Sequence, residues 1–324
     1  MNLSRRHFMA SAAAASVTPA VMSTQTAQAA APMSGKPAPS FYRFKVGEFE
    51  VTTVNDGVVK IANTAALVPT RSPDEINKAL DDAMIPRDNL LNPFTPVVVN
   101  TGKNLVLIDT GWGDNGPATV GTMMSNLAAA GIDPKDVDTI LITHFHLDHI
   151  SGIRAKAGTA NFPNAEIIVA ADEWKFWNDE SEASRAADMW KNNFAAIKRV
   201  FGPIAKDVKQ IAYGKEVVPG ITAVDSRGHS PGHTSYMLSS GNSTLLVLGD
   251  VTNNPALFAR YPEWRLFADM VPDQALEFRR KLLDMASADK IPVIGYHYAF
   301  PAAGCFAKSG NGYTYFPVIW QTTL

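Results

Sequence analysis

Residues 143–149 read Thr-His-Phe-His-Leu-Asp-His, and this stretch decides how the rest of the chain is interpreted. Four residues of metal-ligand type lie within six positions, directly after an apolar run that predicts a buried strand. Residues two apart in an extended loop point the same way, so His144 and His146 can hold one ion. Asp148 and His149 then face a second ion. A single histidine at a strand end is usually an ordinary hydrogen-bonded residue, but no comparable role explains this density.

The other histidines of the chain beyond residue 30 also lie at strand ends or in turns. His229 and His233 belong to the turn Gly-His-Ser-Pro-Gly-His, and His297 follows an apolar run. Asp250 ends another apolar run, where a carboxylate can bridge two cations and offset their repulsion. Imidazole and carboxylate ligands without thiolate favour zinc, manganese, iron or cobalt. The residues therefore predict a site for two divalent ions, with zinc as the expected metal.

Composition excludes several classes of protein. The 324 residues carry a formal net charge of −2, with basic and acidic residues mixed along the chain, so no basic stripe marks a nucleic-acid partner. The single cysteine, Cys305, excludes an intrachain disulfide framework and a multi-thiolate metal site. Hydrophobic residues make up 46% of the chain, enough for one large core or two modest ones.

The first residues have the pattern of an export signal. Ser-Arg-Arg-His-Phe at 4–8 precedes a weakly apolar, alanine-rich stretch, and Ala-Gln-Ala at 27–29 supplies the small residues that signal peptidase reads. The paired arginines resemble a twin-arginine signal. We predict a signal peptide at 1–29, a linker at 30–40 and one domain at 41–324. This organisation predicts a periplasmic or secreted protein without a stable membrane anchor.

Strand-like and helix-like segments alternate along the predicted domain, which indicates an α/β fold with strands covered on both faces. The expected strands are 42–54, 96–100, 105–108, 139–143, 166–169, 221–224, 235–238, 245–248 and 291–295. The expected helices are 72–84, 117–131, 171–178, 182–200 and 273–288.

The motifs THFHLDHISG (143–152), GHSPGHTSY (228–236) and LLVLGD (245–250), in this order, resemble those of the metallo-β-lactamase superfamily. The resemblance implies a four-layer αββα sandwich with the metals at one edge. In the family pattern the first histidine of the Gly-His-Ser-Pro-Gly-His turn is a ligand. This implies that His229 binds metal, while His233 contacts the ligand residues without binding metal itself. The pattern also implies that Asp109 orients a ligand.

These observations give a full expected ligand set. One ion would be held by His144, His146 and His229, the other by Asp148, His149 and His297, and both would share Asp250. Two such ions lower the pKa of a bridging water, and the resulting hydroxide attacks a carbonyl carbon or a phosphorus centre. We therefore expect Asp250 and Asp148 to be the catalytic carboxylates. Neither Ser230 nor Cys305 lies in a recognisable nucleophile motif.

Within the superfamily the chain most resembles methyl parathion hydrolase and related exported enzymes. The resemblance is carried by stretches such as FYRFKVGEFEVTTVNDG (41–57), VVNTGKNLVLIDTG (98–111) and GYHYAFPAAG (295–304). It implies hydrolysis of esters, lactones or organophosphate triesters of small molecules by a homodimer. It also implies an aromatic wall for the leaving group, formed by Trp177 and, with less support, Trp190.

Three alternatives stay open. The first is an acyl-homoserine lactone or other lactone hydrolase, although many such lactonases carry a tyrosine three residues after the bridging aspartate, where this chain has Asn253. The second is an iron-dependent, oxygen-using member of the same fold. The third is a non-enzymatic periplasmic metal-binding protein, which a shared bridging carboxylate disfavours.

Overall fold

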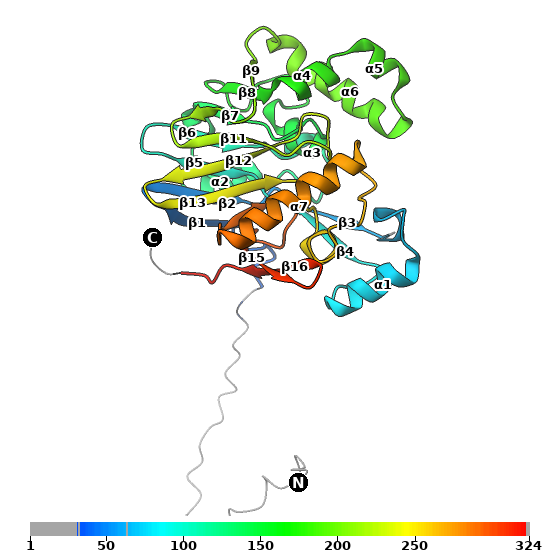
Figure 1. The fold of residues 1–324 in the computed structure, drawn as a ribbon. Coiled ribbons are helices and arrows are strands. Elements are labelled where there is room, and N and C mark those ends of the chain that lie inside the picture. Colours follow the sequence, from blue (N-terminus) through cyan, green and yellow to red (C-terminus); the bar gives the residue numbers. More distant parts are fainter. Residues whose placement is uncertain (1–30, 32, 63, 322–324) are drawn as a thin grey trace, which may run out of the picture. The chain divides into compact units, whose positions relative to one another are not determined.

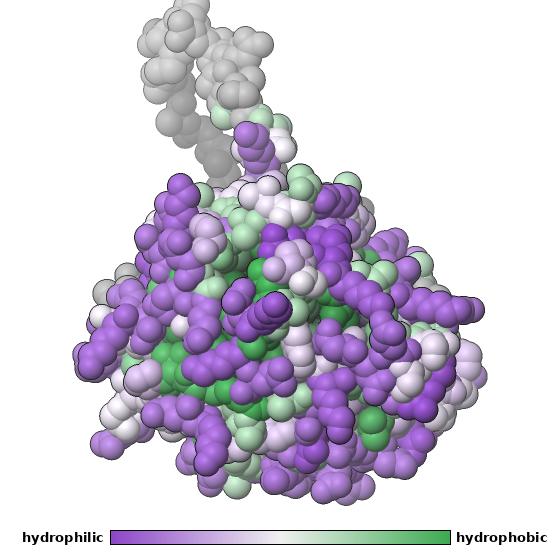
Figure 2. All heavy atoms as spheres, turned by 90° about the horizontal axis from the view of Figure 1, so that it is seen from above, coloured by the Kyte–Doolittle hydropathy of each residue, from purple (hydrophilic) through white to green (hydrophobic). Residues whose placement is uncertain are grey.

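The computed structural model describes residues 31, 33–62 and 64–321, and a compact unit begins at Pro39. The predicted signal peptide at 1–29 lies outside the described residues. Among the residues that are described, no helix combines the length and apolar character needed to cross a membrane. Seen from above (Figure 2), hydrophilic residues cover most of the molecular face, and hydrophobic residues are visible mainly in hollows between them.

Two seven-stranded sheets make up the centre of the compact unit, as far as the structure describes it (Figure 1). In spatial order the first sheet contains β1 (Phe41–Val46), β2 (Phe49–Val54), β5 (Val97–Asn100), β6 (Leu105–Ile108), β7 (Thr139–Leu141), β8 (Glu166–Ala170) and β9 (Lys209–Ile211). The second contains β10 (Glu216–Val218), β11 (Ile221–Asp225), β12 (Thr234–Ser240), β13 (Ser243–Gly249), β14 (Val293–Gly295), β15 (Ala303–Ser309) and β16 (Gly312–Pro317). A separate ribbon pairs β3 (Gly57–Ile61) with β4 (Leu90–Phe94).

Helices cover the outer faces of both sheets. The α-helices of the described residues are α1 (Pro73–Asp82), α2 (Met123–Ala129), α3 (Leu147–Ile150), α4 (Ala171–Trp177), α5 (Glu180–Arg185), α6 (Asp188–Phe201) and α7 (Pro272–Ala288). Of these, α1 packs in a separate cluster with Leu257 and Trp264 and not on either seven-stranded sheet. Leu127 of α2 and Ile197 of α6 pack with Leu107 and Ile140 of the first sheet. On the other side, α7 lies across the second sheet (Figure 1). The layers are therefore helix, sheet, sheet and helix, and the predicted αββα sandwich is confirmed.

The core between the sheets explains why the strands are so apolar. Val51 and Ile108 of the first sheet lie in one buried cluster with Ile221 and Tyr236 of the second. Because strands such as β6 carry apolar residues on both faces, they pack against the opposite sheet and against helices at once. The loops that leave the strand ends carry the polar residues, so the fold brings these loops to one edge of the sandwich.

Two of the predicted helices differ from the observed ones. The helix expected at 117–131 begins only at Met123, because Val58 donates its backbone N–H to the carbonyl of Thr119 and this segment joins the β3 ribbon instead. The helix expected at 182–200 is two helices, α5 and α6. Ala186 and Ala187 between them adopt extended backbone although alanine favours a helix, so tertiary packing overrides the local preference.

Several strands are absent from the sequence prediction or differ from it. The run expected at 42–54 is a hairpin, β1 and β2, that turns at Gly47, where φ is +57°. The β15–β16 hairpin and the β3–β4 ribbon were not predicted. Pro93 lies inside β4, and a proline is normally taken to exclude a strand unless the strand lies at an edge.

Candidate metal centre

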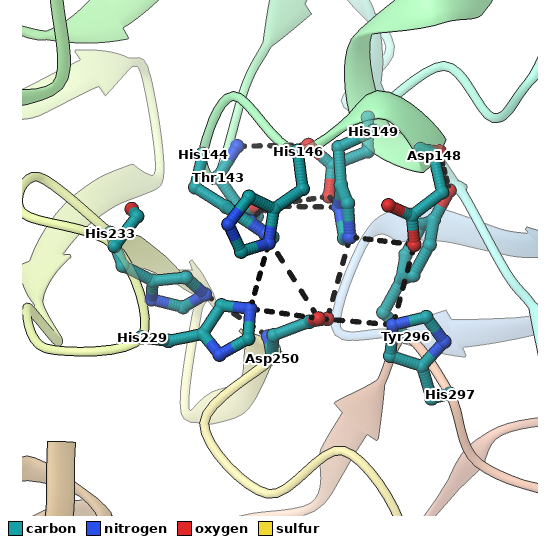
Figure 3. A network of polar contacts seen from close by, with 12 residues as sticks. Thr143, His144, His146, Asp148, His149, His229, His233, Asp250, Tyr296 and His297 are labelled. Carbon is teal, nitrogen blue, oxygen red and sulfur yellow. Dashed lines mark hydrogen bonds and ion pairs between the residues drawn. The ribbon is translucent and has the colours of Figure 1, made fainter. Parts of the chain in front are cut away.

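The predicted ligands come from four separate places in the chain. His144 and His146 follow β7, and Asp148 and His149 lie on the short helix α3. The remaining three follow strands of the second sheet: His229 lies in the turn between β11 and β12, Asp250 follows β13 and His297 follows β14. Figure 3 shows all seven side chains pointing toward one another. The site therefore exists only where the two sheets meet.

The first group consists of His144, His146, His229 and Asp250, whose candidate ligand atoms all lie within 4.8 Å of one another. His229 Nε2 is 3.0 Å from His146 Nδ1 and 3.3 Å from Asp250 Oδ2. His144 Nε2 is 4.0 Å from the same carboxylate oxygen. Three imidazole nitrogens thus converge with one carboxylate, which is the donor set of a zinc-type site.

The second group consists of Asp148, His149 and His297. The Asp148 Oδ2 atom is 3.4 Å from His149 Nε2 and 3.4 Å from His297 Nε2. Asp250 reaches this group as well, because its Oδ1 is 3.5 Å from His149 Nε2 and its Oδ2 is 3.0 Å from His297 Nε2. Asp250 therefore lies between the two groups, where a bridging carboxylate would lie.

Buried atoms without hydrogen-bond partners indicate that these residues fit two cations. His144 Nε2, His149 Nε2 and Asp250 Oδ1 are buried and have no hydrogen-bond partner. A buried polar atom without a partner costs about 1–3 kcal/mol, so three in one place require an explanation. All three point into the cluster, where a divalent cation would satisfy them. The geometry is that of a site built for metal.

The electrostatics of the cluster divide its histidines into neutral and protonated ones. Burial lowers the pKa of His144 and of His146 well below 6.5, so both rings are neutral and offer lone pairs. Burial also disfavours a charged His229, but the carboxylates of Asp250 and Asp269 outweigh it and raise the pKa of His229 to about 9. Without metal, His229 therefore holds a proton that an ion would displace.

Asp109 and His233 lie behind the cluster. Asp109 accepts hydrogen bonds from the backbone N–H and the hydroxyl of Thr143, and its Oδ2 is 2.8 Å from His149 Nδ1. The Asp109 carboxylate thus contacts the ring nitrogen of His149 that faces away from the ligand group, which is how a ligand's orientation is fixed. His233 Nε2 accepts the backbone N–H of Asp250 at 3.0 Å, so it contacts the bridging residue without joining the ligand groups.

Asp269 is a supporting residue that the sequence analysis does not identify. Asp269 Oδ1 is 3.0 Å from His229 Nδ1, and Arg279, which is buried on α7, donates to the other Asp269 oxygen at 3.0 Å. This chain of charges orients His229 just as Asp109 orients His149. Asp269 lies in segment 254–270, which carries no motif, so no sequence signal distinguishes this buried aspartate from the exposed ones.

A cavity of about 350 Å³ opens onto both ligand groups. Apolar side chains make up much of its wall: Ile61, Leu67, Leu147, Met189, Trp190, Leu266 and Phe267. Trp190 stacks on the His146 ring, with centroids 4.8 Å apart and planes 11° apart. Segment 254–270 therefore contributes to the cavity wall through Leu266 and Phe267. The cavity suits a small molecule with an apolar part.

The predicted order of the two tryptophans is wrong. Trp177 was favoured as a substrate contact, yet its side chain is only 2% exposed and does not line the cavity. Its indole N–H donates to Glu173, and its ring packs on Phe194 in the core. Trp190, near the start of α6, lines the cavity instead.

The sequence profile of the Metallo-beta-lactamase superfamily matches residues 95–297, more than half of the chain. The chain belongs to this superfamily. The N-acyl homoserine lactonase AiiA of Bacillus thuringiensis subsp. kurstaki is 24% identical over 240 residues, which cover 67% of this chain and 86% of that protein. The matched range holds all seven candidate ligand residues, and this metallo-β-lactamase-superfamily protein is a two-metal hydrolase.

Solved structures of the superfamily resemble this one closely in fold. The dizinc quorum-quenching lactonase AidC superposes with a TM-score of 0.83 at 24% identity, covering 87% of this chain and 99% of that one. The hydrolase AbOPH superposes with a TM-score of 0.83 at 27% identity, covering 88% of this chain and 100% of that one. Because the sequence identity is low, these matches support the sandwich fold but do not indicate which substrate this chain binds.

Proposed function

We propose that this superfamily member hydrolyses lactones with an apolar substituent, using two zinc ions. The observation that carries the proposal is the apolar cavity that opens directly onto the two ligand groups. The similarity to curated N-acyl homoserine lactonases supports a lactone over the other esters and the organophosphate triesters that the resemblance to methyl parathion hydrolase also implies.

The ligand side chains have distinct parts in this proposal. His144, His146 and His229 would hold one ion, Asp148, His149 and His297 the other, and Asp250 both. When bound, two such ions make a shared water acidic enough to serve as a nucleophile and polarise the carbonyl that it attacks. Asp148 also lines the cavity, so its carboxylate can take the proton that the attacking water gives up and pass it to the leaving oxygen as the ring opens.

Asn253 supports a lactone pocket that differs from the usual one. It lines the cavity three residues after Asp250, and its backbone has φ +27°, a conformation that non-glycine residues rarely adopt. Such strain is often retained where it positions a functional side chain. The Asn253 carboxamide can donate a hydrogen bond to a substrate carbonyl, so it can replace part of the role of the missing tyrosine.

Aryl esters and phosphotriesters are the second candidate class, favoured by the aromatic rings at the cavity. Trp190 and Trp112 both line it, and Trp190 lies beside a metal-ligand histidine. Flat aromatic leaving groups pack well on such rings. This reading predicts activity on p-nitrophenyl esters and triesters that exceeds activity on lactones.

A substrate panel on the zinc-loaded protein tests the proposal. We expect ring opening of lactones with medium acyl chains at kcat/KM above that of p-nitrophenyl esters and phosphotriesters. Chelation and His146→Ala should each abolish the activity, whereas Lys156→Ala, a surface change, should leave it intact. Turnover that survives in His146→Ala would exclude the mechanism, and activity only on triesters would favour the second class.

A further inference from the structure

Glu173 is a buried carboxylate whose hydrogen bonds join two ligand loops. It lies on α4 with 1% of its surface exposed, and it is not among the candidate ligands. Burial raises the pKa of Glu173, and the hydrogen bonds that it accepts offset this rise only in part. A carboxylate in such a place is costly unless all of its lone pairs are used.

Four donors surround the Glu173 carboxylate, two at each oxygen. Oε1 accepts the backbone N–H of Phe145 at 2.7 Å and the indole N–H of Trp177 at 2.8 Å. Oε2 accepts the hydroxyl of Ser230 and the backbone N–H of Gly232, both at 2.7 Å. Charge-assisted bonds of this length are about twice as strong as neutral ones.

The donors lie in two different loops, each of which carries candidate metal ligands. Phe145 lies between His144 and His146 in the loop after β7 of the first sheet, and Ser230 follows His229 in the turn of the second sheet. Oε1 therefore holds one loop and Oε2 holds the other. The result is that His146 Nδ1 and His229 Nε2, from different sheets, face each other at 3.0 Å.

The two glycines of the turn show that it is fixed against helices on both sides. A Cβ at Gly232 would lie 2.0 Å from the backbone nitrogen of Glu173, and one at Gly228 would lie 2.1 Å from that of Ala275 on α7. Only glycine permits contact this close. The turn thus packs directly on α4 beside the Glu173 carboxylate.

We propose that Glu173 is a positioning residue that assembles the metal half-site of His144, His146 and His229 and has little influence on the half-site of Asp148, His149 and His297. This inference rests on the proposed metal site. The Glu173 carboxylate contacts only one of the two half-sites. Three of its four hydrogen bonds come from the loops that carry the ligands of the first half-site, and the fourth comes from the Trp177 ring. None of the four donors lies on α3 or beside His297.

The test measures zinc affinity in two backgrounds, by competition with a chromogenic chelator. His297→Ala removes a ligand from the second half-site, and His146→Ala removes one from the first. The zinc affinity measured in each background is therefore that of the other half-site. Glu173→Gln keeps the size of the side chain but replaces one carboxylate oxygen by an amide N–H₂ group. This group then faces two hydrogen-bond donors and cannot accept from them. We expect it to weaken zinc binding about 10–100-fold in the His297→Ala background, in the range of other supporting residues, and less than threefold in the His146→Ala background.

Controls separate this role from a general loss of structure. Glu180→Gln makes the same chemical change on exposed α5 and should alter neither affinity. Ser230→Ala removes one hydrogen bond to Glu173 without changing any charge, and it should weaken zinc binding at the first half-site about threefold. This variant tests the proposal even if Glu173→Gln does not fold. The proton resonance of the Trp177 indole N–H should also move upfield in Glu173→Gln as its carboxylate partner is lost.

Different results would contradict the role of Glu173 and the metal site on which it rests. Equal losses in both backgrounds, or no loss in either for Glu173→Gln and Ser230→Ala, would overturn the role of Glu173 while leaving the metal site standing. A protein without these substitutions that binds no zinc would instead overturn the proposed function.

Discussion

At the scale of single residues, the cluster depends on groups that hold the ligands as much as on the ligands. His149 is oriented by Asp109, His229 by Asp269, and the His297 Nδ1 atom lies 2.8 Å from the carbonyl of Pro93. Each partner contacts the ring nitrogen that faces away from the cluster and thereby fixes both the tautomer and the direction of the other nitrogen.

Asp269→Asn tests this for the residue that sequence reasoning missed. The variant should weaken zinc binding about 10–100-fold, because His229 loses its negatively charged partner. It should also lower the melting temperature, because buried Arg279 loses its counter-charge. Chelator competition and thermal melts provide the measurements, with Asp273→Asn, an exposed neighbour on α7, as control. Unchanged zinc affinity in Asp269→Asn would contradict the assignment.

Trp190 and Phe194, one turn apart on α6, should separate substrate binding from stability. Trp190→Ala removes cavity wall and should raise KM for apolar substrates about tenfold or more, since a lost apolar contact costs roughly 1–3 kcal/mol. Phe194→Ala empties part of the core and should cost about 3–5 kcal/mol of unfolding free energy with KM unchanged. Steady-state kinetics and urea unfolding distinguish the two; an unaltered KM in Trp190→Ala would remove it from the pocket.

At the scale of elements, Asp56 joins α2 to the loop that follows β6. Its carboxylate accepts the backbone N–H of Met123 at the start of α2 and that of Trp112 in the loop. Burial raises the pKa of Asp56 to about 6, and these hydrogen bonds moderate the rise. The protonated form is thus favoured more in the folded chain than in the unfolded one.

This shift predicts a pH dependence of stability with a definite sign. The folded chain binds the Asp56 proton more tightly, so this group contributes to the unfolding free energy below pH 4 and the contribution is lost as pH rises through 6. The loss amounts to about 3 kcal/mol at most. Urea unfolding of the metal-free protein at pH 4.5 and 7 should show wild type losing more stability than Asp56→Asn. Parallel pH curves for the two proteins would contradict the shift.

The sequence predicted the elements whose signals are local and missed those that depend on tertiary contacts. The apolar strands β6, β8 and β13 lie where periodicity placed them, within a residue or two. The extended Ala186 and Ala187 contradict their own helix preference, and β4 contains a proline, so neither feature could be read locally. Tertiary packing decides such segments.

The same distinction holds within the site. His144, His146, Asp148 and His149 are neighbours in the chain, so spacing alone predicts that they lie together. The choice of His229 over His233 as a ligand required the resemblance to a family, because both histidines lie in the same turn and local sequence does not show which of them faces the metals. Glu173 and Asp269 act through buried bonds across more than 25 residues, and a carboxylate on a helix or in a loop has no sequence mark of that contact.

At the scale of the whole molecule, bound metal should stabilise the sandwich by joining its two sheets. An ion present at about a thousand times its Kd adds roughly 4 kcal/mol to the unfolding free energy. For a chain of this size that corresponds to a rise in melting temperature on the order of 10 °C. Differential scanning calorimetry with zinc and with chelator measures the difference. The same melting temperature in both conditions would show that the cluster holds no metal.

The distribution of the ligands along the chain sets the order in which the centre can form. Four ligands lie between residues 144 and 149, but the last, His297, is encoded near the end of the 324 residues. During synthesis the early ligands leave the ribosome long before their partners exist. A complete pair of coordination sites can therefore form only after His297 has been synthesised, so a product terminated before that residue would lack the means to retain its cofactor.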